Sequence, residues 1–355
     1  MSPNAMNRVR DLLPVVLFAV ALWFLPDLLR AWSGRASVSY LSLVTNGLGL
    51  AVLALSWDIL ARTGQLSLAH AAFYGAGAYV TAVLARLDVG PLWLGIPAAG
   101  VFAVLLALGL GVVTLRLKGI YFAIATLAFT EVLRAVVRQL PTSFAGGSAG
   151  INVEPLFRPA FDPETMERWE IAFQRNEGYF LLYAGLLLLT IGLSLWTRRS
   201  RLQHAFTAIR TNEEVAGVMG VRPARMKLLA FALSSLSVGM LGAIHAHRVG
   251  SVIPEGAFSV ETTVFALVTP IFGGLYTTLG PILGAGVLAG IEETLKRNLA
   301  DGYLIGYGLV LVLSILFMPR GIVGMVRGVA RRRRAARTDT PPDPATDGTT
   351  DGSEA

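Results

Sequence analysis

Long apolar stretches recur along the whole chain, and they constrain its fold more than any other feature. Most are close to the ~20 residues that an α-helix needs to cross ~30 Å of hydrocarbon. The 355 residues are 54% hydrophobic and only 15% charged, which is typical of a membrane protein. We therefore expect an all-α, polytopic transmembrane helix bundle with about ten spans, at residues 12–29, 38–60, 69–87, 92–115, 119–137, 179–196, 228–245, 261–275, 281–295 and 303–318.

Lysine and arginine predict the orientation of the spans, because cytoplasmic loops carry an excess of both. With a cytoplasmic amino terminus, most of the 30 basic residues lie inside, including Arg62 and the runs 198–227 and 320–337. Both termini are then cytoplasmic. We read 12–29 as a retained span, since no clean signal-peptide cleavage site follows it. The expected divisions are an amino end at 1–11, a transmembrane domain at 12–318 with an outer loop at 139–178 and a cytoplasmic loop at 197–227, and a basic, then disordered tail at 319–355.

The stretch 64–79 is unusually polar for an apolar region. Polar side chains in a bilayer are costly and usually face a bundle interior or a water-filled path, and small residues allow close helix contact. Gly64 is expected to interrupt a helix and Ser67 to cap the next one. We interpret the stretch as lining a passage or packing immediately behind it. A tight helix contact held by internal hydrogen bonds is the alternative, above all for His70. The polar residues concerned are Gln65, Ser67, His70 and Tyr79.

The span 119–137 carries further polar residues. Tyr121 and Thr126 are polar groups inside an apolar span, and we expect them to lie at or just behind the same path. Glu131 is followed three residues later by Arg134, which is the spacing of an ion pair on a helix. This spacing favours a structural pair over a proton relay. Tight segments around 273–274 and 280–281 also predict short or broken helices near the path.

The loop 197–227 is polar yet patterned. Phe206, Ile209, Val215 and Met219 form a partly apolar stripe at helical spacing, and Gly220 fits a helix C-terminal cap. An amphipathic helix on the cytoplasmic side can lie on the membrane or dock into a partner. The alternative is a solvated basic face that only fixes topology.

The chain lacks the residues that several kinds of chemistry require. The chain has no cysteine, and its four histidines show no metal-ligand spacing. No lysine follows a glycine, so a phosphate loop for ATP hydrolysis is not expected. The glycine-rich run 146–150 is read as a gate or a turn. The pI is about 10.0, but the basic residues cluster between spans and do not predict nucleic-acid binding. We expect no catalytic site, metal or cofactor on this chain.

Taken in order, six stretches together resemble the permease subunits of bacterial ABC importers for branched-chain amino acids (LivM type). The sequence departs from the family pattern at Arg62, where an aromatic residue is usual, at Ala69, where glycine is usual, and at Thr211 and Glu214. These departures leave the identity of the solute open. The matching stretches are 64–73, 117–129, 146–151, 208–220, 273–281 and 318–321.

The resemblance implies a multi-pass protein of the bacterial inner membrane that works with several partners. A periplasmic binding protein delivers a small solute, a second homologous permease subunit completes the path, and two ATPase subunits hold ATP and magnesium. Urea, short amides and aromatic acids are alternative solutes, and an ATP-independent secondary transporter is an alternative class. The basic tail is expected to lie against anionic membrane lipid. The cytoplasmic helix would couple to the ATPase through Ala208, Arg210, Asn212, Glu213 and Gly220.

Overall fold

The computed structural model describes residues 3–157, 168–299, 302–317 and 321–325. This part of the chain is almost entirely helical, so the all-α prediction is confirmed. Two short strands, β1 (Ile151–Asn152) and β2 (Ser251–Val252), pair antiparallel. The helices, with three 3₁₀ turns (η), are α1 (Pro3–Ser33), η1 (Gly34–Ala36), α2 (Ser37–Ala61), α3 (His70–Arg86), η2 (Leu92–Leu94), α4 (Gly95–Thr114), α5 (Ile120–Gln139), α6 (Thr142–Ala145), η3 (Gly147–Ala149), α7 (Arg168–Arg199), α8 (Leu202–Thr211), α9 (Glu213–Val218), α10 (Pro223–Val249), α11 (Pro254–Ala257), α12 (Val260–Gly273), α13 (Leu279–Leu299) and α14 (Tyr303–Phe317).

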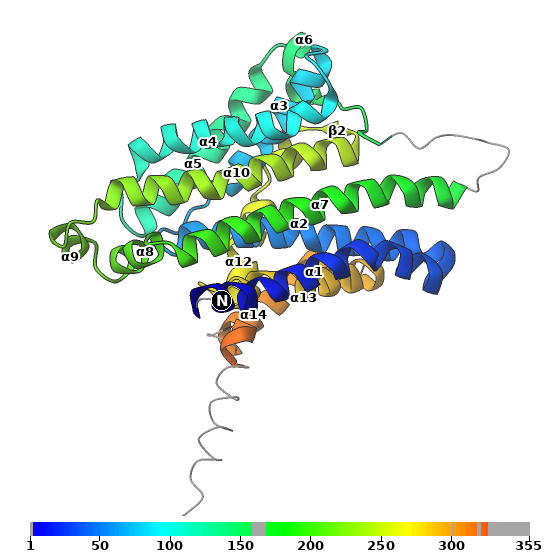
Figure 1. The fold of residues 1–355 in the computed structure, drawn as a ribbon. Coiled ribbons are helices and arrows are strands. Elements are labelled where there is room, and N and C mark those ends of the chain that lie inside the picture. Colours follow the sequence, from blue (N-terminus) through cyan, green and yellow to red (C-terminus); the bar gives the residue numbers. More distant parts are fainter. Residues whose placement is uncertain (1–2, 158–167, 300–301, 318–320, 326–355) are drawn as a thin grey trace, which may run out of the picture.

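The long helices lie side by side along one direction (Figure 1). α10 packs on α3 and α4, and it also contacts α2 and α7. α1 and α13 pack against α2 from the opposite side to α10, and α14 lies beyond them. The short α8 and α9 lie beyond one end of α7 and α10 (Figure 1). The bundle therefore has a distinct α8–α9 end.

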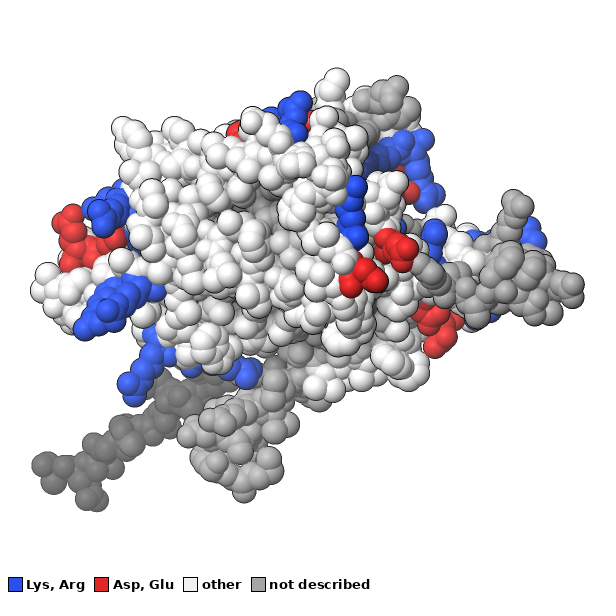
Figure 2. Space-filling view, turned by 90° about the horizontal axis from the view of Figure 1, so that it is seen from above, with Lys and Arg blue, Asp and Glu red and all other residues white. Residues whose placement is uncertain are grey.

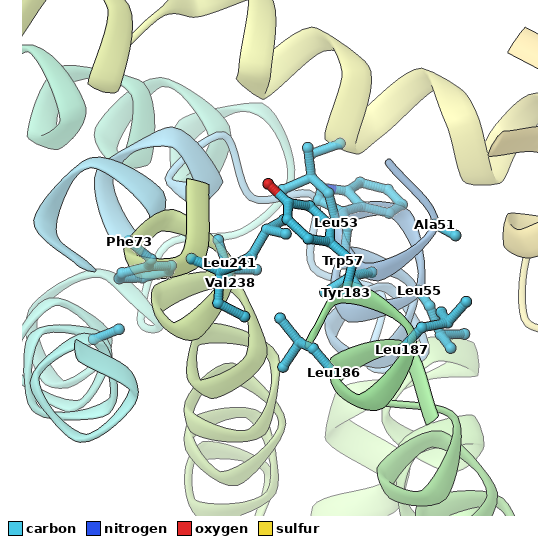
Figure 3. Packing of buried hydrophobic residues seen from close by; sticks show 14 of the residues in the cluster. Ala51, Leu53, Leu55, Trp57, Phe73, Tyr183, Leu186, Leu187, Val238 and Leu241 are labelled. Carbon is cyan, nitrogen blue, oxygen red and sulfur yellow. The ribbon is translucent and has the colours of Figure 1, made fainter. Parts of the chain in front are cut away.

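The core lies where α2, α3, α7 and α10 meet. Trp57 of α2, Tyr183 of α7 and Leu241 of α10 are buried and point toward one another (Figure 3). Glycines bring α3 and α10 into backbone contact: a Cβ at Gly77 would lie 2.1 Å from the carbonyl oxygen of Gly239. Such close approach is possible only for the small residues that the sequence places there.

Six stretches of the described chain are long and apolar enough to cross a membrane. The first, Pro14–Ala61, holds both α1 and α2. α3 and α14, with 17 and 15 residues, are too short to be among these stretches. α13 is long enough but is less apolar, because it carries four charged residues near its end. On the face shown in Figure 2, the middle is mostly uncharged and the charged side chains gather toward the edges. The molecule is thus a polytopic helical membrane protein.

Several predicted boundaries shift in the structure. α7 begins at Arg168, so its first three turns lie inside the predicted outer loop 139–178. Residues 3–11 of the predicted amino end belong to α1. α12 is short, with 14 residues, and ends at Gly273 as predicted. Residues 280–281 instead lie in the first turn of α13, which has 21 residues. The run 146–150 is a compact turn with three glycines at positive φ. The four arginines of the tail lie outside the described residues.

Candidate functional site

The interruption between α2 and α3 is the first part of the candidate site. After Ala61 comes a turn with Gly64 at φ 82°, a conformation that favours glycine. Residues 65–69, which we call the break segment, contain no helix. Their side chains alternate: Gln65 and Ser67 are buried, whereas Leu66 is 48% exposed. The polar side chains therefore point into this subunit, and Leu66 points out of it.

Hydrogen bonds from three helices hold the backbone of the break segment. Trp57 Nε1 of α2 donates to the carbonyl oxygen of Ser67 at 2.8 Å. Thr126 Oγ1 of α5 accepts from the N–H of Leu68 at 2.9 Å, and Thr263 Oγ1 of α12 donates to the carbonyl oxygen of Leu68 at 3.4 Å. Irregular backbone inside a membrane protein is tolerated where protein satisfies it. α2, α5 and α12 provide that support here.

Ser67 does not cap α3 as the sequence predicted. The helix begins at His70 with Ala69 as its N-cap, and no side chain caps it. Ser67 Oγ instead accepts from the N–H of Ala69 at 3.1 Å, because the helix begins two residues later than expected. The ring of His70 is fully buried, with Nε2 2.8 Å from Ser234 Oγ of α10. This geometry matches the tight helix contact, and a solute contact for His70 stays a prediction.

The remaining predicted path residues lie in different environments. Thr126 is buried beside the break segment. The ring of Tyr79 lies further along α3 and stacks on Phe258 at 5.9 Å, and Tyr121 is 70% exposed on the surface of α5. The sequence did not single out Leu66, because an apolar residue in an apolar region gives no sign that its side chain is exposed.

The loop after α7 forms two helices, so the prediction of one continuous helix over 208–220 is wrong. α8 ends at Thr211 and α9 begins at Glu213. Asn212 between them has φ −158° and ψ 110°, and its Oδ1 accepts from the N–H groups of Glu214 and Val215 at 3.0 and 3.1 Å. An asparagine that caps a new helix in this way interrupts the preceding one.

Gly220 ends α9 as the sequence predicted. Its φ is 85°, and its N–H donates to the carbonyl oxygen of Gly217 at 3.1 Å. The N–H of Val221 donates to the carbonyl oxygen of Ala216 at 3.0 Å. These paired bonds are a Schellman motif, in which glycine is favoured at this position.

The apolar stripe predicted over this loop divides between the two helices. Phe206 and Ile209 of α8 are buried against the rest of the chain, and Ala208 is partly buried. Val215, Val218 and Met219 are 57%, 89% and 79% exposed, and we call these three residues the α9 patch. α8 is therefore the anchored half of the loop, and α9 offers a free apolar surface.

Glu213 and Arg210 are among the residues that attach the loop to the bundle. Glu213 Oε2 accepts from Lys227 Nζ of α10 at 2.7 Å, and Lys227 is 2% exposed. The guanidinium of Arg210 lies 3.8 Å from the ring centroid of Tyr276, close enough for a cation–π interaction. Glu213 therefore has a basic partner within this chain.

A buried ion pair lies at the same end of the bundle. The sequence placed Arg62 among the basic residues of the inner side, and in the structure Arg62 and Asp58 are both 0% exposed. Arg62 Nε and Nη2 donate to Asp58 Oδ2 at 3.0 and 2.8 Å. The remaining donors reach the Ser194 carbonyl oxygen, Ser194 Oγ and Thr197 Oγ1 of α7. Asp58 Oδ1 accepts from the N–H of Tyr276 at 2.6 Å. We call this the Asp58–Arg62 cluster.

The three parts of the site are in direct contact. Tyr276 joins the Asp58–Arg62 cluster to α8, because its N–H bonds Asp58 and its ring lies under Arg210. A Cβ at Gly64 would lie 3.3 Å from the Cα of Arg210, so α8 also lies against the turn that leads into the break segment. Glu131 and Arg134 form the expected ion pair on α5.

Comparison with known proteins identifies the family. A family model described as "Branched-chain amino acid transport system / permease component" matches residues 39–317. The chain belongs to this permease family. It is 30% identical to the high-affinity branched-chain amino acid transport system permease protein LivM of Escherichia coli K12, over 90% of this chain and 77% of LivM. It is 22% identical to the corresponding permease protein LivH of Salmonella typhimurium, over 79% of this chain and 93% of LivH. No solved structure matches.

Family membership decides between the classes that the sequence left open. Permease components are transport subunits and not enzymes, so the chain is a permease subunit of an ABC importer in the inner membrane. An ATP-independent secondary transporter is excluded on this ground. The break segment and the α8–α9 loop both fall inside the matched residues 39–317.

Proposed function

We propose that this permease subunit moves branched-chain amino acids into the cell, in a complex with a second homologous permease subunit, two ATPase subunits and a periplasmic binding protein. The names of LivM and LivH, which are both similar to this chain, support the solute and the pairing of two permeases. The observation that carries the mechanism is the contact between α8 and the turn at Gly64. Through this contact, a movement of α8 that is caused by a docked ATPase is transmitted to the turn next to the break segment.

The proposed topology has ten spans with both termini in the cytoplasm. The count takes α1 and α2 separately and adds α3, α13 and α14 to the helices that are long enough by themselves. The α8–α9 end then faces the cytoplasm, where the basic run 198–227 is favoured. This placement exposes the α9 patch to the compartment that holds ATP.

The proposed transport step uses the break segment as a movable wall of the path. Leu66 faces out of this subunit and toward the second permease, and the buried hydrogen bonds of Ser67 and Leu68 keep the backbone ordered behind it. A path for a zwitterion requires passage without a deep binding well. ATPase closure moves α9, Lys227 carries that motion into α10, and Arg210 carries it to Tyr276 and to the turn at Gly64.

Uptake by proteoliposomes tests the proposal. The assembled complex is expected to accumulate radiolabelled leucine only with ATP on the side of the α8–α9 end, and a protonophore should leave the rate unchanged. Excess unlabelled isoleucine or valine should compete, whereas urea should not. The purified permease chain alone should hydrolyse no ATP. Leucine uptake by this chain without an ATPase, or vanadate-sensitive hydrolysis by this chain alone, would contradict the assignment.

A further inference from the structure

A cavity lies inside this subunit, between α2, α3, α7, α10, α12 and α13, and the proposed transport step does not use it. Its volume is about 180 Å³, which is roughly the space of six water molecules in the liquid. One molecule of the size of an amino acid fits into this space, whereas a phospholipid is too large. Leu53, Tyr183 and Leu241 of the lining lie close together in Figure 3. The apolar side chains of the lining are Leu43, Leu50, Leu53, Leu241, Phe265 and Ala289.

Three polar rings complete the inner part of the lining, and they come from Tyr74, Tyr183 and His245. Tyr183 Oη lies 3.2 Å from His245 Nδ1, and the ring centroids of Tyr74 and His245 are 5.7 Å apart. Within the part of the chain that the structure describes, no hydrogen bond reaches the Tyr74 hydroxyl or His245 Nε2. Both atoms can donate a hydrogen bond, so a molecule in the cavity would give them a partner.

The charged residues of the lining are already paired and carry both signs. Glu292 Oε1 accepts from Lys296 Nζ at 2.5 Å, and Glu293 Oε1 accepts from Arg297 Nε at 2.7 Å. Both pairs are partly exposed and lie near the end of α13, which is the outer end in the proposed topology. A molecule that enters here meets no net charge, which favours a neutral or zwitterionic solute over an acidic or basic one.

The lining also indicates the form of the solute. Several water molecules would need more polar partners than two free atoms provide, whereas a molecule with an aliphatic body and one polar end uses both parts of the lining. We propose that the cavity binds one α-amino acid with a branched aliphatic side chain. Its carboxylate accepts from the Tyr74 hydroxyl and from His245 Nε2, and its side chain lies against the leucines of α2 and α10. The identity of this solute rests on the proposed function.

The cavity lies directly behind the break segment. Thr262 of α12 lines the cavity, and the next residue, Thr263, donates to the carbonyl oxygen of Leu68 at 3.4 Å. Leu53 lines the cavity one turn before Trp57, which also holds the break segment. A solute in the cavity therefore contacts the same two helices, α2 and α12, that support the break segment.

Equilibrium dialysis of the purified full-length chain against radiolabelled leucine tests this site. One leucine should bind per chain, unlabelled isoleucine and valine should compete, and glutamate should not. Tyr74→Phe removes a single hydroxyl group and should weaken leucine binding about tenfold, as expected for one hydrogen bond to a charged group. Ala289→Phe fills the cavity and should abolish binding. Tyr40→Phe removes a hydroxyl group outside the cavity and should leave binding unchanged.

Two further measurements complete the test. The melting temperature of each variant without leucine shows whether it is folded, and in folded protein Tyr74→Phe and Ala289→Phe should reduce the rise in melting temperature that leucine causes. Variants at both positions that bind leucine as tightly as the wild type would overturn the site. Leucine uptake by the assembled complex without leucine binding to this chain would overturn the site and leave the proposed function intact. Binding without uptake would contradict the proposed function and support the site.

Discussion

Arg62→Met should prevent recovery of a stable permease. All five N–H donors of the Arg62 guanidinium are hydrogen-bonded, and its partner Asp58 is fully buried. Removing one member of a buried pair leaves an uncompensated charge and costs about 3–5 kcal/mol. We expect aggregation after detergent extraction, or a large fall in melting temperature, measured by size-exclusion chromatography and thermal unfolding of the purified chain.

Two further variants separate loss of the pair from loss of an arginine. Arg116→Met removes an exposed arginine and should leave the melting temperature unchanged. Asp58→Asn with Arg62→Met removes both charges and keeps an oxygen that can accept from the N–H of Tyr276. This double variant should be more stable than Arg62→Met alone. An Arg62→Met protein as stable as wild type would show that the Asp58–Arg62 cluster does not hold α2 to α7.

A charge in the α9 patch should uncouple ATP hydrolysis from the permease. Val218 is 89% exposed, so Val218→Asp leaves the packing of this chain intact while it puts a charge into the apolar surface proposed for docking. Loss of one central apolar contact weakens a protein interface by about tenfold or more. We expect normal membrane levels of the permease and loss of the ATP hydrolysis that loaded binding protein stimulates in the reconstituted complex.

Two further variants test whether the loss of stimulated ATP hydrolysis depends on α9. His204→Asp adds the same charge at an exposed position of α8, outside the α9 patch. This variant should retain the stimulation of ATP hydrolysis by loaded binding protein. Gly220→Val places a branched side chain at φ 85°, which is strained for any residue with a Cβ, and it should lower stimulation by loosening the end of α9. If Val218→Asp and Gly220→Val both keep full stimulation, the α8–α9 loop only fixes topology, which is the alternative that the sequence left open.

Local features of the site followed from the sequence. Gly64 and Gly220 occupy positive-φ positions where glycine is favoured, so their roles were visible in the residue type itself. The Asn212 break was also encoded, since asparagine followed by two glutamates is a helix start. The apolar stripe around Asn212 predicted one helix, so the N-cap of α9 was not recognised from the sequence.

Features that depend on distant contacts did not follow from the sequence. Arg62 lies next to a helix end in a basic-biased chain, and only its bonds to Ser194 and Thr197, more than a hundred positions away, show that it is buried. The inward direction of Gln65 and Ser67 depends on Trp57, and on α5 and α12, which hold the backbone of the break segment. Polarity alone did not show that Gln65 and Ser67 are buried in this subunit while Leu66 is exposed.

The accessibility of position 66 tests the path most directly. The chain has no cysteine, so Leu66→Cys is its only thiol, and its reaction with a charged methanethiosulfonate reagent can be followed by the mass of this subunit in the reconstituted complex. Leu105→Cys, at a 59% exposed position within unbroken α4, is the control. The account predicts that Leu66→Cys is modified during ATP turnover, that leucine slows the reaction and that modification stops uptake, while Leu105→Cys stays unmodified. A Leu66→Cys subunit that is as unreactive as Leu105→Cys during full transport would contradict the assignment of the break segment to the solute path.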